Sequence, residues 1–113
     1  MATFALLSQP SLRELRTHYQ ALASVTRLKI LEFLAGIQEI TVQELADALD
    51  LSQPALSWHL RMLRRGQLVR GRRAGRLVYC SINREGLNAF HRELSTRMAP
   101  RPQVRAAHQR SEV

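Results

Sequence analysis

The sequence predicts a small, mainly α-helical domain that carries one β-hairpin before its last helix. Five segments repeat apolar residues every three or four positions, which is the pattern of amphipathic helices. Ser, Thr or Asn stands before each of these segments, where its side chain can cap the first turn. Between residues 68 and 82 the apolar period changes to two, which is typical of strands. The length of 113 residues allows a single domain.

Composition excludes several classes of protein. Apolar residues make up 45% of the chain, which is enough for a packed core. Lysine and arginine number 17 against 9 acidic residues, and the net charge of +8 predicts a polyanionic partner, nucleic acid before an anionic membrane. The single cysteine, Cys80, excludes a disulfide framework and a Cys-based zinc finger. No apolar run approaches the roughly 20 residues of a membrane helix, and the N-terminus lacks the basic region of a secretory signal. We therefore expect a cytoplasmic protein that does not associate with membranes.

Two helices are expected near the start of the chain. Residues 1–10 carry little pattern and are expected to form a flexible N-terminus. The first helix is predicted over residues 11–23, because Ser11 and Glu14 have the spacing of a capping box. Its apolar stripe is formed by Leu12, Leu15, Tyr19 and Leu22. The second helix is predicted over residues 25–35, between a serine cap and a glycine stop.

The next two helices are joined by a tight turn. A short helix is predicted over residues 42–49, after a second capping box that begins at Thr41. Ser52 caps the following helix, predicted over residues 53–65, and Pro54 suits its first turn. Two helices linked in this way, the second of them basic, indicate a helix-turn-helix.

A β-hairpin with a basic tip is predicted directly after these helices. Its strands are expected over residues 68–70 and 77–82, with a Gly- and Arg-rich loop over residues 71–76. Strand alternation places Val78, Cys80 and Ile82 on one face of the second strand, and Cys80 is a small buried residue if this face meets the core. The hairpin makes the module a winged helix-turn-helix in the order α-α-α-α-β-β-α.

The last helix is expected to begin after Asn83, whose side chain can cap it. Its apolar face is formed by Leu87, Phe90, Leu94 and Met98. The folded domain is therefore predicted to span residues 11–98. Residues 99–113 are rich in Pro, Arg, Gln, Ala and Ser and are expected to form a disordered basic tail.

The helix over residues 53–65 is expected to enter the major groove of double-stranded DNA. Its outward polar stripe is formed by Gln53, Ser57, Arg61 and Arg64. Glutamine suits adenine, arginine suits guanine or phosphate, and serine suits either kind of contact. The expected interface also includes Ser52 and the hairpin arginines Arg72, Arg73 and Arg76.

Three segments of the chain resemble the ArsR/SmtB family of bacterial repressors. ALASVTRLKIL at residues 21–31 looks like the family's second-helix signature, LDLSQPALSWHLRML at residues 49–63 is similar to its recognition helix, and GRLVY at residues 75–79 resembles its wing. The resemblance implies a homodimer that represses its own promoter and releases DNA when an inducer, often a metal ion, binds. His59 stands where the family has its recognition-helix histidine, and we expect it at the DNA interface.

The resemblance also implies a dimer formed through the first and last helices. The apolar stripe of the first helix is more than a single small domain can bury, and the last helix offers a matching face. The expected interface residues are Leu12, Leu15, Tyr19, Leu22, Phe90 and Leu94.

The sequence departs from the metal-sensing members of that family. Many arsenic and cadmium sensors carry Cys-Val-Cys where this chain has Thr41 and Gln43, which cannot ligate a soft metal. Zinc and nickel sensors carry Asp-x-His and His-x-x-Glu on the last helix, where this chain has His91 followed three residues later by Leu94. We therefore expect neither a metal site nor a cofactor.

Two weaker candidates for a sensing role stay open. His18 and His91 would approach each other if the first and last helices pair in a dimer, but two ligands fall short of a tetrahedral set. The alternative is a pair of half-exposed helix histidines. Cys80 is a possible redox site, although a buried thiol is inert. The sequence names neither an inducer nor an operator nor the regulated genes.

The residue patterns do not indicate an enzyme, because they include no catalytic triad, phosphate-binding loop or pair of carboxylates. The leading interpretation is a sequence-specific transcriptional regulator, a dimeric repressor that binds an inverted-repeat operator. The alternatives are a winged-helix protein–protein interaction module and a non-specific chromosome-binding protein. The arginines of the second helix-turn-helix helix and the hairpin argue against the first alternative, and a preference among DNA sequences would exclude the second.

Overall fold

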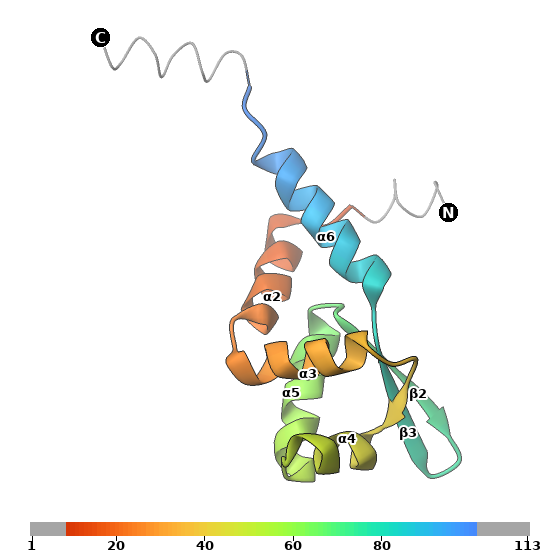
Figure 1. Cartoon of the computed structure of the whole chain (residues 1–113). Helices are drawn as coiled ribbons and strands as arrows, with labels where there is room; N and C mark the ends of the chain where they lie inside the picture. The colour runs from red at the N-terminus through yellow and green to blue at the C-terminus, as the bar shows by residue number, and fades with distance from the viewer. Residues whose placement is uncertain (1–8, 102–113) are drawn as a thin grey trace.

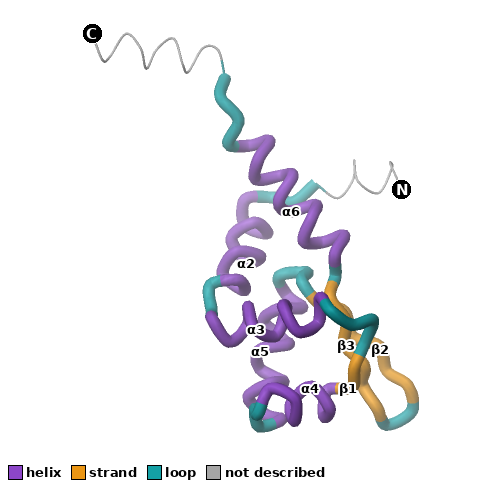
Figure 2. The backbone as a smooth tube through the Cα atoms, in the orientation of Figure 1, coloured by secondary structure: helices purple, strands orange, loops and turns teal. Residues whose placement is uncertain are grey.

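The computed structural model describes residues 9–101, in which five helices accompany a three-stranded antiparallel sheet (Figures 1 and 2). The elements are α2 (Leu12–Leu22), α3 (Val25–Ala35), β1 (Ile40–Thr41), α4 (Val42–Leu49), α5 (Gln53–Arg65), β2 (Val69–Ala74), β3 (Leu77–Ile82) and α6 (Arg84–Arg97). The predicted winged helix-turn-helix is confirmed, with β1 added. Most of the expected flexible N-terminus and basic tail lies outside the described residues.

The capping signals read from the sequence appear as hydrogen bonds at the helix starts. The Ser11 hydroxyl accepts from the backbone N–H of Glu14 at 3.1 Å, and the Glu14 carboxylate accepts from the N–H of Ser11 at 3.0 Å. Thr41 and Glu44 make the same reciprocal pair at the start of α4. These bonds satisfy backbone donors that a helix start leaves free, so α2 and α4 begin where the sequence predicts.

The core lies between α3, α4, α5 and the hairpin. The largest apolar side chains with almost no exposed surface come from all of these parts: Ile30, Leu34, Leu45, Leu56, Leu63 and Leu68. On α5, Leu56, Leu60 and Leu63 point inward and leave the rest of the helix surface to solvent. Burial of one face of α5 therefore fixes which of its residues are presented outward.

The turn between α4 and α5 depends on a left-handed residue. Asp50 has φ 55° and ψ 45°, a conformation that Asp and Asn adopt more readily than most residues. The N–H of Leu51 then donates to the carbonyl of Ala46 at 2.9 Å, which closes the end of α4. Ser52 starts α5 by accepting from the N–H of Ala55 at 3.2 Å.

Strand β1 is missing from the sequence prediction. It pairs antiparallel with β3, with Ile40 opposite Cys80 and Thr41 opposite Tyr79, so the sheet order is β1-β3-β2. Two residues are too few to show a strand period, which is why the sequence pattern does not reveal it.

The hairpin is longer and its turn tighter than predicted. Strand β2 extends to Ala74, so the strand predicted over residues 68–70 is too short, and most of the loop predicted over residues 71–76 is paired with β3. Gly75 and Arg76 alone form the turn, with Gly75 at φ +62°. Glycine at the first position of a two-residue turn is typical of type II′ hairpins.

Helix α6 starts against the link between α5 and β2. The Asn83 side chain accepts from the N–H of Gly86 at 3.1 Å and donates to the carbonyl of Gln67 at 3.0 Å. A Cβ on Gly86 would lie 2.1 Å from that same carbonyl oxygen, so only glycine fits. From this anchor α6 runs beside α2, at the opposite end of the molecule from the hairpin turn (Figure 1). No helix within residues 9–101 is long and apolar enough to cross a membrane.

Candidate nucleic-acid interface

Helix α5 presents the polar residues that the sequence singles out for DNA reading. Gln53, Ser57, Arg61 and Arg64 are all exposed. They form a stripe along one flank of the buried leucines, so the core holds the helix while this stripe stays available. The Ser52 hydroxyl is already engaged as the helix cap, and its further contact with DNA stays a prediction.

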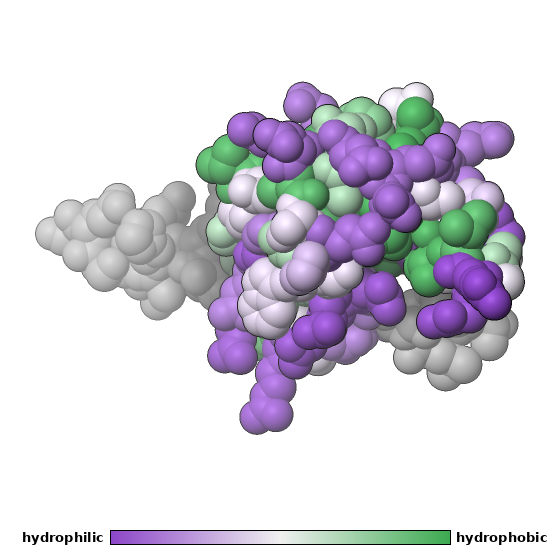
Figure 3. Space-filling view, turned by 90° about the horizontal axis from the view of Figure 1, so that it is seen from below, coloured by the Kyte–Doolittle hydropathy of each residue, from purple (hydrophilic) through white to green (hydrophobic). Residues whose placement is uncertain are grey.

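A cleft of about 390 Å³ joins this stripe to the hairpin and to the start of α4. Its lining includes the four stripe residues together with Gln43 of α4, Arg76 of the turn and Leu77 of β3. Three elements therefore converge on one polar groove, and Figure 3 shows that this end of the molecule is largely hydrophilic with separate apolar patches. Gln43 and Leu77 cannot be assigned to the cleft from the sequence pattern, because their place there depends on how α4 and β3 meet α5.

The hairpin places its two neighbouring arginines on opposite faces. Arg73 pairs with Val78 and shares a face with Gly71, where an added Cβ would lie 3.9 Å from the Arg64 guanidinium. Arg73 is therefore on the α5 side of the hairpin. Arg72 pairs with Tyr79 on the other face.

Arg72 is engaged within the chain. Its guanidinium forms an ion pair with Glu39 and lies 4.6 Å from the centre of the Tyr79 ring. The hydrogen bond from Arg72 lowers the pKa of the Glu39 carboxyl, so this carboxylate stays charged beside the arginine. The sequence predicts the same role, contact with DNA, for Arg72, Arg73 and Arg76. In the structure Glu39 partly neutralises Arg72, whereas Arg73 and Arg76 form no ion pair among the described residues.

His59 is half-buried and held by an arginine of α3. The Arg27 guanidinium lies 3.4 Å from His59 Nδ1 and also donates to the carbonyls of Ala21 at 2.7 Å and Gln20 at 3.2 Å. Burial, and then the charge of Arg27, lowers the pKa of His59, so the ring is neutral near pH 7. His59 therefore lies at the edge of the core, and its expected contact with DNA stays a prediction.

His18 differs from the sequence prediction. It was expected to be half-exposed, but only 1% of it is exposed. Its Nδ1 donates to the carbonyl of Gly66 at 2.6 Å, and its ring stacks on Phe90 with centroids 4.2 Å apart. Burial lowers its pKa, so the neutral ring is favoured. The hydrogen bond and stacking join α2 to the end of α5 and to α6, which explains why a polar residue stands in an apolar stripe.

Residues 9–101 contain no group of three or more His, Cys, Asp or Glu side chains that could hold a metal ion. Thr41 at the family's soft-metal position serves the α4 cap, where its hydroxyl donates to Glu44 at 2.7 Å. His91 is exposed on α6. His18 is buried, so metal binding through its other ring nitrogen, Nε2, would require that nitrogen to become accessible to solvent.

Cys80 faces the core, so the face of β3 that carries it is the buried one. It is 3% exposed, and its thiol donates to the carbonyl of Ile40 at 3.4 Å. Burial raises its pKa to about 11, so the thiol stays protonated at neutral pH. Since the thiolate is the reactive form, this environment disfavours oxidation. A redox role for Cys80 stays an untested hypothesis.

The residues expected at a dimer interface differ in exposure. Leu15 and Phe90 are 5% and 2% exposed, so both belong to the interior of one chain. Leu12 is 62% exposed, and Tyr19, Leu22 and Leu94 are partly exposed. Met98, at the end of α6, is 64% exposed. An exposed apolar surface thus remains at the α2–α6 end of the molecule.

Comparison with known proteins gives consistent matches. The family described as "Helix-turn-helix domain" matches residues 22–72. A transcriptional repressor SmtB homolog of Synechocystis sp. is 36% identical over 90 residues, which cover 80% of this chain and 67% of that protein. The transcriptional activator HlyU of Vibrio cholerae is 40% identical over 71 residues, which cover 63% of this chain and 65% of that protein.

A solved structure matches in fold as well as in sequence. It is the homodimeric winged helix-turn-helix DNA-binding domain of a possible ArsR-family transcriptional regulator from Mycobacterium bovis. The TM-score is 0.64 at 32% identity, and the match covers 71% of this chain and 74% of that one.

Proposed function

Because this chain belongs to the ArsR/SmtB family of transcriptional regulators, which are not enzymes, we propose that it is a homodimeric, sequence-specific DNA-binding repressor. The observation that carries the proposal is the cleft in which the α5 stripe meets Arg76 of the hairpin turn. Glutamine, serine and arginine on one exposed helix face suit base edges, and the unpaired arginines beside them suit phosphates.

In the proposed complex, α5 lies in the major groove and the hairpin contacts the backbone beside it. Gln53 and Ser57 read base edges, whereas Arg73 and Arg76 bind phosphates and position the helix. Arg61 and Arg64 lie between these groups and can serve either purpose. Arg72 holds the hairpin to Glu39 and contributes less to the contact with DNA.

The proposed dimer forms through α2 and α6, where Leu12, Tyr19, Leu94 and Met98 leave apolar surface exposed. The homodimeric relative from Mycobacterium bovis supports a homodimer, and the exposed apolar surface supports its formation at α2 and α6. A two-fold dimer reads an inverted repeat whose half-sites lie about 34–36 Å apart, one turn of DNA, or a multiple of it.

The test is selection of binding sequences from a random duplex pool, followed by titration of the selected and a scrambled duplex. We expect an inverted repeat, and an affinity that falls about 10³-fold between 50 and 200 mM salt, as six or more phosphate contacts require. If no sequence were enriched but the affinity still fell steeply with salt, a non-specific chromosome-binding protein would be favoured. A flat salt response would instead favour a protein–protein module.

The resemblance to the SmtB homolog, a repressor, supports repression by this chain. The Vibrio relative is named an activator, so activation is the alternative to test. A reporter gene placed behind the selected sequence separates the two. Lower expression with the protein present supports repression, and higher expression contradicts it.

A further inference from the structure

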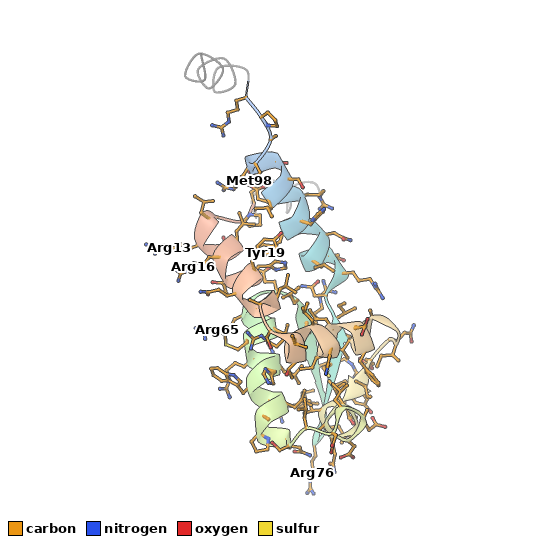
Figure 4. The ribbon with its side chains drawn as sticks, turned by 60° about the vertical axis from the view of Figure 1, so that its left-hand side comes forward. Arg13, Arg16, Tyr19, Arg65, Arg76 and Met98 are labelled. Carbon is orange, nitrogen blue, oxygen red and sulfur yellow. The ribbon has the colours of Figure 1, made fainter. Side chains whose placement is uncertain are left out.

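A second basic surface lies on the face of α5 opposite its buried leucines, roughly a quarter turn around the helix from the cleft stripe. It consists of Arg13 and Arg16 on α2 with Arg65 and Trp58 on α5, and we call it the α2–α5 ridge. All four side chains are exposed, Trp58 by 50%. In Figure 4, Arg13, Arg16 and Arg65 project from the same side of the molecule, whereas Arg76 marks the hairpin turn at the lower end.

Close packing between α2 and α5 brings these residues together. Gly66, the residue after Arg65, is buried against the middle of α2, where an added Cβ would lie 3.2 Å from the Cα of His18 and 3.4 Å from the carbonyl of Thr17. The hydrogen bond from His18 to Gly66 holds the same junction. Arg65 therefore emerges beside the turn of α2 that carries Arg16.

The charge of the ridge is not compensated within the described chain. The ion pairs among residues 9–101 use Arg70, Arg72 and Arg97, and none of them includes a ridge arginine. Gathering like charges on one surface costs electrostatic energy, and a bound polyanion removes that cost. The function of the cleft does not account for these arginines, since they lie outside its lining.

The exposed indole of Trp58 indicates which class of polyanion binds the ridge. A half-exposed indole among arginines suits a polyanion that also carries flat or apolar groups, as the sugars and bases of nucleic acid do. An acidic polypeptide would also satisfy the arginines and cover the indole, but the ridge shares α5 with the proposed DNA-reading stripe. The combination therefore favours nucleic acid.

The position of the ridge on α5 indicates which part of the DNA it meets. One residue along a helix turns the side chain by about 100°, so Trp58 and Arg65 point well away from their neighbours Ser57 and Arg64. A helix about 10–12 Å across fills a major groove about 12 Å wide and so meets both of its walls. The hairpin lies toward one wall, and the ridge faces the other.

We propose that the α2–α5 ridge binds the sugar–phosphate backbone on the wall of the major groove opposite the hairpin. The inference rests on the proposed function, because it requires α5 to lie in the groove. Trp58 packs against the backbone sugars at the level of α5, and Arg65, Arg16 and Arg13 continue the contact along the phosphates toward α2. These contacts carry no sequence information and add equally to specific and random binding.

The first test compares two variants of equal net charge. Arg13→Gln/Arg16→Gln removes two charges from the ridge, and Lys29→Gln/Arg92→Gln removes two from exposed sites on α3 and α6. If each protomer of a dimer loses both phosphate contacts, the salt slope falls by about 3.6 and affinity at 0.15 M salt falls about 10³-fold on operator and random duplexes alike. The control variant should stay close to the parent, and both should remain dimers.

Equal affinities and salt slopes for the ridge and control variants would overturn the inference, while strong binding by the parent would leave the proposed function standing. Failure of the parent itself to bind duplex DNA would overturn both. If the ridge variant kept DNA affinity but lost retention on poly-L-glutamate, the ridge would be assigned to an acidic protein and the inference would again be wrong.

The second test uses Trp58 as a local probe, because it is the sole tryptophan of the chain. Acrylamide quenching of its fluorescence should fall by at least about half when the full-length protein binds a saturating operator duplex, since a contacted indole loses the exposure that it has in the free protein. Unchanged quenching in the saturated complex would overturn the inference, whatever the effect of the arginine variants.

Discussion

The two ends of this molecule differ in how far a single chain covers their apolar surface. At the α4–α5–hairpin end, the apolar face of α5 is buried, Leu77 stays exposed, and polar and basic residues line a formed cleft. At the α2–α6 end, Leu12 and Met98 are 62% and 64% exposed, and no other element within residues 9–101 covers them. In the proposed assembly, the α4–α5–hairpin end, which we call the reading end, is complete in a single chain, whereas a second copy covers the apolar surface of the α2–α6 end. Because the proposed DNA contacts and the proposed dimer interface lie at different ends, a substitution can disturb one of them without the other.

Charged substitution at the α2–α6 end should have the largest effect. Leu12→Asp combined with Tyr19→Asp places charge on the proposed interface and should turn the dimer into 12.9 kDa monomers. A monomer loses the second half-site, so operator affinity should fall by about 10²- to 10⁴-fold. Light scattering and operator titration measure the two effects.

Leu77→Asp is the matched control, because Leu77 is an apolar residue of similar exposure, 49%, at the reading end. It should leave the oligomeric state unchanged. If it split a dimer as well, or if the α2 variant stayed dimeric, the division between the two ends would be wrong.

Within the reading end, the two faces of the hairpin should respond differently. Arg73→Ala removes an unpaired arginine from each protomer and should lower affinity about 30-fold at 0.15 M salt on any DNA sequence. Arg72→Ala should cost no more than about twofold, because Glu39 already neutralises this arginine. Titrations at several salt concentrations should show a reduced slope for Arg73→Ala alone. Equal losses for the two variants would remove the distinction between the faces.

A smaller effect concerns stability at the junction of the two ends. The pKa of His18 is lowered in the folded protein, so the unfolded chain binds more protons, and the free energy of unfolding should fall as pH drops below about 6.5. One such group contributes a slope of at most about 1.4 kcal/mol per pH unit. His18→Gln, which keeps an N–H donor for Gly66, should reduce the slope measured by urea unfolding between pH 5 and 7. The pKa of His59 is lowered too, so part of the slope should remain. An unchanged slope in the His18 variant would contradict this role.

Local signals account for what could be predicted from the sequence. The capping pairs at Ser11 and Thr41 and the apolar stripe of α5 are set by residues within one or two turns, and the helices follow them closely. Strand alternation, which is also local, groups Cys80 with Val78 and Ile82 on one face, whereas packing against the helices decides that this face is buried. The long-range features were missed or misjudged. Strand β1 exists only through its pairing with β3.

The candidate site divides in the same way. The α5 stripe could be read from helix periodicity alone, whereas the place of Gln43 in the cleft depends on contacts between elements. The pairing of Arg72 with Glu39 joins residues 33 positions apart, and the burial of His18 depends on Gly66 and Phe90. A sequence pattern identifies which side chains a helix presents. It does not identify which of these side chains will be buried, hydrogen-bonded or ion-paired by a distant segment.

The central claim is that α5 reads bases while the hairpin binds phosphates, and Gln53 tests it most directly. The measurement is the affinity of Gln53→Ala for the selected operator and for a scrambled duplex at the same salt concentration. We expect a loss of about 1–3 kcal/mol per half-site on the operator with random binding unchanged. Equal losses on both duplexes, or no loss on either, would contradict the assignment of α5 as the reading helix.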